Sequence, residues 1–286
     1  MQKFSVIIPA YNSEKRLVRT LDSVKNQTCK NFEIVITDDG SRDNTTDTIR
    51  EYIRRNPELE ISMSSQPNRG IGAARNNAIS RSTGDYLAFL DDDDIWYPDK
   101  LEAVAAYLKR HPGTDLVSHR VYKTYPDGRK KKFPNSKPKE PCYDSLLFKG
   151  NTLHISATVV NRKAVLQAGG FTEDSSLGAE DYELWLRLAY AGASFGFIES
   201  FLGEIASRRD SFSWNIEYMT SCVLNVLEFN LKFALLKCDK PEMEIRNAIK
   251  WRKAGEILSS TVKLCRKNDF RLAGKYLRLL LEEIKK

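Results

Sequence analysis

Four consecutive aspartates, Asp91 to Asp94, follow the apolar run Tyr86–Leu90 in the segment FLDDDDIW. Neighbouring carboxylates repel one another, since two unit charges about 4 Å apart cost roughly 4 kcal/mol at an effective dielectric constant near 20. A divalent cation relieves this repulsion, and Mn²⁺ or Mg²⁺ binds carboxylate oxygens, with phosphate supplying further ligands. The cluster therefore predicts a Mn²⁺ or Mg²⁺ site. The alternative is an acidic turn in which Asp94 or Asp99 caps the helix expected to start near Pro98.

A second polar segment, TDDGSRDNT, spans residues 37–45 and follows another apolar run. Asp39 and Gly40 are typical of a tight turn. The carboxylate of Asp38 or Asp39 could accept a hydrogen bond from a pyrimidine N–H group or from ribose hydroxyls. Asp43 or Asn44 could start the next helix, but that local role does not explain Asp38 and Asp39.

The segment NRGIGAARN, residues 68–76, combines two glycines with an arginine. Gly70 and Gly72 permit close approach of the backbone to a ligand. Arg75 could then contact a phosphate or a base near the start of a helix. The spacing is not the G-x-G-x-x-G pattern of dinucleotide-binding folds, because Arg75 stands where that pattern needs glycine.

The segment GAEDYELWLRL, residues 178–188, begins an amphipathic helix with Glu180 and Asp181. Acidic side chains are favoured in a first helical turn by the helix dipole. One of the two could instead act as a general base, and the residues alone leave both interpretations open.

These segments must be positioned by an alternation of strands and helices. Apolar runs predict buried strands at 4–9, 32–37 and 86–90, a weaker strand at 60–64, and further strands at 116–125 and 155–160. Helical spacing predicts helices at 45–55, 72–80, 101–109 and 179–191. This rhythm indicates an α/β fold with a mostly parallel sheet and helices on both faces. Ligands bind at the carboxyl ends of such strands, where Tyr11, Asn12, Asp38, Asp39 and the four aspartates stand.

The rest of the chain is less specific. Residues 127–141 are basic and proline-rich, with a run from Arg129 to Lys132, and indicate a hairpin tip or mobile loop. Beyond Trp214 the pattern is helical, with an apolar stripe formed by Ile245, Ile249, Leu258, Val262 and Cys265. We therefore expect a catalytic domain at 1–214 and a helical extension at 215–286.

Composition narrows the class of protein. The 286 residues are 41% hydrophobic and 29% charged, as in globular proteins. Of the net charge of +7, the tail from Asn215 holds +6, with 15 Lys and Arg against nine Asp and Glu. The positive charge of that tail either lies on a solvent-exposed helical face or binds an anionic surface. The tail lacks a nucleic-acid-binding motif. No signal peptide or uncharged membrane span is evident, and scattered cysteines favour a reduced, cytoplasmic compartment.

Taken in order, these segments resemble family 2 inverting glycosyltransferases of the GT-A fold, over about residues 4–213. SVIIPAYN resembles the family's opening strand and nucleotide-binding turn, DDGSRDNT its base-binding segment, and NRGIGAARN its glycine-arginine segment. FLDDDDIW resembles its D-x-D motif, and AGGFTED and AEDYELWLRL its acceptor-side elements. The resemblance implies the following roles: donor binding by Pro9, Tyr11, Asn12, Asp39, Gly70, Arg75 and Asp92; metal binding by Asp91 and Asp93; catalysis by Asp181 or its neighbour Glu180; and an acceptor pocket shaped by Trp185.

One segment departs from the family pattern. Many relatives carry a histidine after the base helix, whereas ASRRDSFS here places Arg208 or Arg209 at that position. An arginine does not ligate a metal, but it can contact a diphosphate.

Together these features predict an inverting transferase that moves sugar from a nucleotide-diphosphate sugar, a UDP-sugar by the resemblance, to an acceptor hydroxyl in cell-surface glycan synthesis. The acceptor would be a glycan or lipid-linked glycan, with no nucleic-acid partner. The helical tail could contact the inner face of the membrane peripherally or form a homodimer. The alternatives are a sugar-nucleotide-forming nucleotidyltransferase, which would need a glycine-rich loop where PAYNSEKR has none, and a non-catalytic nucleotide-sugar-binding protein.

Overall fold

The computed structural model of the chain describes residues 2–140, 142–174, 177–208 and 215–285. These residues form two compact units. Unit 1 comprises residues 1–137, 152–173 and 191–207, and unit 2 comprises residues 138–151, 174–190 and 208–286. Each unit is interwoven in sequence with the other. The domain boundary predicted at residue 214 stays a prediction.

Unit 1 contains a nine-stranded sheet and five α-helices among the described residues. Its strands are β1 (Phe4–Ala10), β2 (Phe32–Asp38), β3 (Ile61–Ser65), β4 (Tyr86–Phe89), β5 (Ile95–Trp96), β6 (Leu116–Thr124), β7 (Lys130–Lys132), β8 (Thr158–Asn161) and β9 (Phe195–Ala206). Its helices are α1 (Leu17–Lys25), α2 (Thr45–Arg55), α3 (Ile71–Arg81), α4 (Lys100–Arg110) and α6 (Arg162–Gln167), with a short 3₁₀ turn at Ile155–Ala157.

The sheet is mostly parallel, as the sequence predicts. Its order is β3-β2-β1-β4-β8-β6-β9-β5, with β7 paired to β6. Strands β1 to β4 are mutually parallel, and β8 is antiparallel to both β4 and β6, so β6 runs in the same direction as β4. Strand β9 is parallel to β6. The carboxyl ends of six strands therefore lie at one edge of the sheet.

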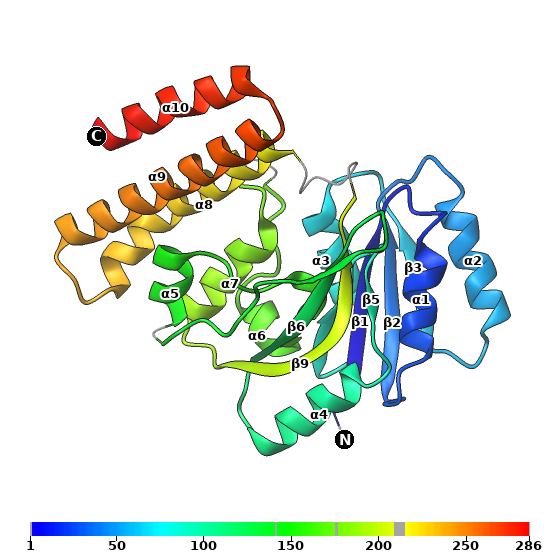
Figure 1. Cartoon of the computed structure of the whole chain (residues 1–286). Helices are drawn as coiled ribbons and strands as arrows, with labels where there is room; N and C mark the ends of the chain where they lie inside the picture. Colours follow the sequence, from blue (N-terminus) through cyan, green and yellow to red (C-terminus); the bar gives the residue numbers. More distant parts are fainter. Residues whose placement is uncertain (1, 141, 175–176, 209–214, 286) are drawn as a thin grey trace. The chain divides into compact units, whose positions relative to one another are not determined.

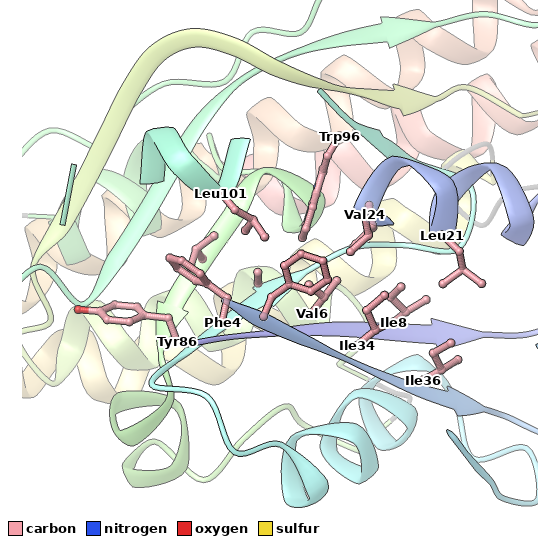
Figure 2. Packing of buried hydrophobic residues seen from close by; sticks show 14 of the residues in the cluster. Phe4, Val6, Ile8, Leu21, Val24, Ile34, Ile36, Tyr86, Trp96 and Leu101 are labelled. Carbon is pink, nitrogen blue, oxygen red and sulfur yellow. The ribbon is translucent and has the colours of Figure 1, made fainter. Parts of the chain in front are cut away.

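The main hydrophobic core covers one face of this sheet. Phe4, Val6 and Ile8 alternate along β1 with side chains on the other face, as the twofold repeat of a strand requires. They pack under α1, α2 and α4, and Figure 2 shows β1 and β2 side chains pointing toward Leu21, Val24, Trp96 and Leu101. On the opposite face, the small residues Ala73, Ala74 and Ala78 are buried in α3, which lies against β1 and β2.

One strand prediction needs correction, and strands β5, β7 and β9 were not predicted as strands. The strand expected at 155–160 starts at Thr158, because Ile155–Ala157 form the 3₁₀ turn. The basic segment forms a hairpin, the first of its two predicted possibilities, with β7 antiparallel to the end of β6. Strand β9 was not predicted because its apolar residues do not alternate regularly. The polar residues Glu199, Ser200 and Glu204 interrupt its apolar pattern.

Unit 2 is helical in the part that the structure describes. It contains α5 (Cys142–Lys149), α7 (Glu180–Tyr190), α8 (Ile216–Lys237), α9 (Glu242–Arg266) and α10 (Phe270–Lys285). Helices α8 and α9 pack side by side, and α10 returns along α9 (Figure 1). The predicted apolar stripe is half right, since Ile245 and Ile249 are buried but Leu258 and Val262 are exposed. Ile257 and Leu264 occupy the α9 core instead.

Helix α8 is long and apolar enough to cross a membrane by length and composition alone. A third of its most apolar window is buried within the structure. A core helix passes the same test, so this is weak evidence for a membrane span.

The core predicts a clear contrast between two residues of α1. Leu21 is fully buried and Val18 is 42% exposed. Leu21→Ala should destabilise the protein by about 2–5 kcal/mol, because it removes buried methyl groups and leaves a cavity. Val18→Ala should change stability by less than about 0.5 kcal/mol. Urea unfolding of both variants measures the difference, and equal effects would contradict this packing of α1.

Candidate active site

The carboxyl edge of the sheet in unit 1 brings together three of the segments singled out in the sequence. They are the turn after β1, the turn after β2 and the acidic turn after β4 (Asp91–Asp94). The loop between β3 and α3 joins them there. Each of these segments follows a strand that ends at the same edge of the sheet. Segments about eighty residues apart in the sequence therefore lie next to one another in the fold.

Asp91 forms an ion pair with a buried arginine of α3. Arg75 is 1% exposed, and its Nη2 donates to Asp91 Oδ1 at 2.7 Å. The Arg75 guanidinium also lies 5.2 Å from the ring centroid of Phe171, within the range of a cation–π contact. Asp91 N in turn donates to Ser156 Oγ at 3.1 Å. The two motif residues Arg75 and Asp91 thus meet directly, which the sequence did not indicate.

Asp92 is held by the turn after β1. Arg16 donates from Nε to Asp92 Oδ1 at 3.1 Å and from Nη2 to Oδ2 at 3.2 Å, and Tyr11 N donates to Oδ2 at 3.2 Å. The same guanidinium donates to the carbonyl oxygens of Tyr11 and Asn12. Burial raises the pKa of Asp92, and the charge of Arg16 opposes that rise. Arg16 therefore fixes the shape of the turn. Its charge also lowers the free-energy cost of burying the ionised carboxylate of Asp92.

Asp94 points into the interior rather than toward a helix end. Its side chain is buried, and its Oδ1 accepts a hydrogen bond from Ala206 N at 2.7 Å. Asp99 occupies the N-cap position of α4 and makes no side-chain capping bond. The capping interpretation of the aspartates is therefore wrong. Burial, then the charges of Asp93 and Asp91, raise the pKa of Asp94 well above its usual value.

That repulsion indicates how the acidic turn fits a cation. The charges of Asp93 and Asp91 both raise the pKa of Asp94, so the turn concentrates negative charge. Within the described residues, no group of three or more His, Cys, Asp or Glu side chains is arranged to hold a metal by itself. The hard oxygen donors of the turn fit Mn²⁺ or Mg²⁺ when phosphate oxygens complete the coordination.

Asp39 organises the loop that leads into α3. Its Oδ1 accepts from Gln66 Nε2 at 2.8 Å and Arg69 N at 2.9 Å, and its Oδ2 accepts from Gly70 N at 2.9 Å. A carboxylate offers about four acceptor positions, so roughly one remains beyond these three bonds. Asp39 thus holds the loop before α3 in place, and its carboxylate can still accept about one hydrogen bond from a ligand.

Asp38 and Asn12 connect the turns after β1 and β2. Asp38 Oδ1 accepts from Ser41 N at 3.0 Å and from Ser41 Oγ at 2.6 Å. Asn12 has a left-handed backbone (φ 47°), which asparagine tolerates better than most residues. Asn12 Oδ1 accepts from Arg42 N at 2.8 Å, and Asn12 N donates to Ser41 Oγ at 2.9 Å. These bonds hold the two turns in register.

Pro9, in β1, and Asp93, in the acidic turn, belong to unit 1, whereas the predicted catalytic and acceptor residues belong to unit 2. Glu180 and Asp181 begin α7, as predicted, and Asp181 Oδ1 accepts from Tyr182 N at 2.7 Å. Trp185 is fully buried. Gly178, just before α7, has a positive φ of 43°, and a Cβ there would lie 1.9 Å from Cys222 Sγ. Only glycine therefore lets the start of α7 approach α8 so closely.

The segment that departs from the family pattern is described only in part. Arg208 is half-buried and belongs to unit 2, whereas Arg209 lies outside the described residues. The five cysteines form no disulfide within the described residues.

Sequence reasoning missed two contributors to the acidic turn. Arg16 stands 76 residues before Asp92, and the N–H of Ala206 stands 112 residues after Asp94. A basic residue close after the first strand could have suggested Arg16 as a partner for the aspartates. A backbone donor such as Ala206 has no signal in the sequence, because every residue except proline carries one.

Comparison with known proteins decides the family. The family model described as glycosyl transferase family 2 matches residues 5–169, more than half of the chain. The chain belongs to glycosyl transferase family 2. Consistent with this, it is 32% identical over 202 residues to the uncharacterized glycosyltransferase MJ1057 of Methanocaldococcus jannaschii, covering 69% of this chain and 68% of that one.

A second family 2 relative is similar over nearly the whole chain. It is the poly(ribitol-phosphate) beta-N-acetylglucosaminyltransferase TarS of Staphylococcus aureus, 27% identical over 279 residues, 96% of this chain. The chain spans 47% of the length of TarS.

Solved structures show that this family 2 chain has the GT-A fold. TarS 1–349 in complex with UDP-GlcNAc matches with a TM-score of 0.68 and 23% identity, over 94% of this chain and 75% of that one. The mannosyltransferase PcManGT of Pyrobaculum calidifontis, in complex with GDP-Man and Mn²⁺, matches with a TM-score of 0.65 and 19% identity, over 99% and 84% of the two chains. The predicted fold class and family are thereby confirmed.

The ion pair of Arg75 and Asp91 makes a prediction about stability. Arg75→Met removes the buried partner of this pair and should cost about 1–3 kcal/mol, because the half-buried Asp91 carboxylate is left without its guanidinium. Arg75→Met combined with Asp91→Asn should recover part of that loss. Arg81→Met, an exposed arginine of the same helix, should cost less than about 1 kcal/mol. Denaturant unfolding of the native protein, of these variants and of Asp91→Asn alone tests the coupling, and additive effects of the two single substitutions would contradict it.

Proposed function

We propose that this chain is a metal-dependent, inverting glycosyltransferase that moves a sugar from a UDP-sugar to an acceptor hydroxyl in cell-surface glycan synthesis. The observation that carries the proposal is the meeting of the acidic turn, Arg75 and the Asp39 loop at one carboxyl edge of the sheet. Family membership and the nucleotide-sugar complexes of similar structures support it.

The donor base and ribose bind beside the turns after β1 and β2. Asp39 recognises the base with its remaining acceptor position, close to the backbone of Gly70. Pro9, Tyr11 and Asn12 form the adjoining wall, because the Arg16–Asp92 pair holds their backbone against the acidic turn. Asp92 thus contributes to donor binding by positioning this wall.

The diphosphate lies over the acidic turn and Arg75. Asp91 and Asp93 would hold Mn²⁺ or Mg²⁺, with phosphate oxygens as further ligands. When bound, the cation neutralises charge that develops on the leaving nucleoside diphosphate. Arg75, already paired with Asp91, adds positive charge next to the same phosphates and keeps the Asp91 carboxylate oriented.

Asp181 serves as the general base, with Glu180 as the neighbouring carboxylate of the same helical turn. Its carboxylate takes the proton of the acceptor hydroxyl while that oxygen bonds to the anomeric carbon. The bond from the anomeric carbon to the diphosphate oxygen breaks in the same step, so configuration inverts. Trp185 has no exposed surface, and it shapes the acceptor pocket by supporting α7 from inside.

The acceptor is a glycan or a lipid-linked glycan, and the enzyme works in the cytoplasm. The helices of unit 2 provide either a peripheral contact with the inner face of the membrane or a homodimer interface. Exposed apolar side chains on α9 and α10, including Trp251, Leu258 and Leu281, support one of these two uses.

Asp181→Asn should separate binding from chemistry. Loss of a general base typically lowers the rate by about 10²–10⁴-fold, while affinity for the donor should change by less than about twofold. Release of UDP from UDP-GlcNAc and related donors measures turnover, and calorimetry measures donor affinity. Asp239→Asn, an exposed carboxylate between α8 and α9, is the matched control. Near-normal turnover by Asp181→Asn would remove Asp181 from this role.

Asp93→Ala should reveal the cation through binding alone. In the presence of Mn²⁺, UDP affinity should fall by about tenfold or more, because one metal ligand is lost. Without Mn²⁺ the variant and the native protein should bind UDP similarly. Asp99→Ala, exposed at the start of α4, should leave both affinities unchanged. If calorimetry found no effect of Mn²⁺ on UDP binding by the native protein, metal dependence would be refuted.

A further inference from the structure

The hairpin of β6 and β7 gathers positive charge on one face. Lys123 of β6 lies directly opposite Lys131 of β7 in the antiparallel register, so both side chains project from the same face. Arg129 lies in the turn, directly before the first residue of β7. Like charges that face each other across a strand pair destabilise it. An anion bound between them would remove that cost.

These cations surround one aromatic ring. The charged groups of Arg129, Lys123 and Lys131 lie 5.8, 5.9 and 5.9 Å from the ring centroid of Tyr125. Arg129 also pairs with Asp127 at 2.6 Å. Lys131 makes no ion pair with any described residue. The face therefore combines excess positive charge with a planar ring.

The opposite face of the hairpin also combines a positively charged side chain with aromatic rings. Lys132 lies 5.6 Å from the ring centroid of Phe201, and Tyr122 stacks on Phe201 at a centroid distance of 4.2 Å. Lys132 likewise makes no ion pair within the described part of the chain. Lys130 differs, because it binds Glu204, which also accepts from Thr124 Oγ1 at 2.6 Å. Lys130 thus anchors the hairpin, whereas Lys131 and Lys132 present their charge to solvent.

The hairpin adjoins the proposed transfer site within unit 1. Thr124, next to Lys123, pairs with Ala206, whose N–H binds Asp94. The charges of Asp91 and Lys123 also act in opposite directions on the pKa of His154, which places both near that ring. An extended acceptor bound along the hairpin would therefore continue toward the acidic turn.

We infer that one face of this hairpin, formed by Lys123, Tyr125, Arg129 and Lys131, binds the phosphate-bearing backbone of an anionic glycan acceptor. The inference rests on the proposed transferase function and specifies its acceptor class. Lysine and arginine bind phosphodiester oxygens, and the ring between them packs against sugar or polyol carbons.

An anionic glycan fits this surface better than an anionic membrane. Surfaces that dock on lipid insert apolar side chains into the headgroup region. The large hydrophobic side chains that are exposed in the described residues include none from this hairpin. Its exposed tip, residues 126–129, holds Pro126, Asp127, Gly128 and Arg129.

Binding of a labelled glycerol-phosphate oligomer to the full chain tests the inference. The native protein should bind it in fluorescence anisotropy, with affinity that falls as salt rises. Lys123→Glu combined with Lys131→Glu, which reverses the two facing charges of this surface, should weaken binding by about tenfold or more, a change of at least one decade in Kd. Lys109→Glu combined with Lys163→Glu, both exposed in unit 1 away from the hairpin, should stay within about twofold of native.

Parallel measurements separate this inference from the transferase proposal. The affinity for UDP in the presence of Mn²⁺ should be equal in the native protein and the two double variants. If the native protein did not bind UDP, the transferase proposal would be refuted, but the inference about polymer binding would not. Equal weakening by the two double variants would overturn the hairpin site. So would tighter hairpin-dependent binding to phosphatidylglycerol vesicles or RNA than to the oligomer, or absence of oligomer binding by the native protein.

Discussion

Electrostatic repulsion within the acidic turn is the constraint on which the rest of the site depends. Four carboxylates in sequence after a core strand are unstable unless each finds a partner. The fold supplies Arg75 to Asp91, Arg16 to Asp92 and the N–H of Ala206 to Asp94. These partners come from α3, from the segment before α1 and from β9, so satisfying the turn draws three distant segments to one edge of the sheet.

In the turns beside the acidic turn, polar side chains likewise hydrogen-bond to the loops around them. Asp39 satisfies three donors of the Gln66–Gly70 loop, and Asn12 joins the turns after β1 and β2. Charged and polar residues that are proposed to bind the donor are therefore already used to hold its binding loops. Because such groups are fixed before a ligand arrives, little ordering is left to be done on binding. Preorganised polar groups are also the arrangement that stabilises charge developing in a transition state.

The family and the fold rest on different evidence from the chemistry. A family model matching residues 5–169 establishes the family, and TM-scores of 0.68 and 0.65 establish the GT-A fold. The proposed base belongs to α7, beyond the matched region and in unit 2. Its local geometry follows from Gly178, whose missing side chain lets the start of α7 approach Cys222. The proposed acceptor side therefore depends on packing within the helical unit, whereas the proposed donor side depends on strand ends.

The sequence by itself determined the class of fold, the edge of the sheet and the family. Runs such as FSVIIP, FEIVIT and YLAFL are buried on both faces, so they specify parallel strands, and the polar residues that follow them must share an edge. Only the tertiary structure decided which group meets each carboxylate. Arg16 and Ala206 lie 76 and 112 residues from their aspartates, and local rules could offer only helix capping as an alternative role for Asp94. Local patterns report hydrophobic burial and backbone preference over a few residues, whereas the partner of a buried charge is set by chain segments that meet only after folding.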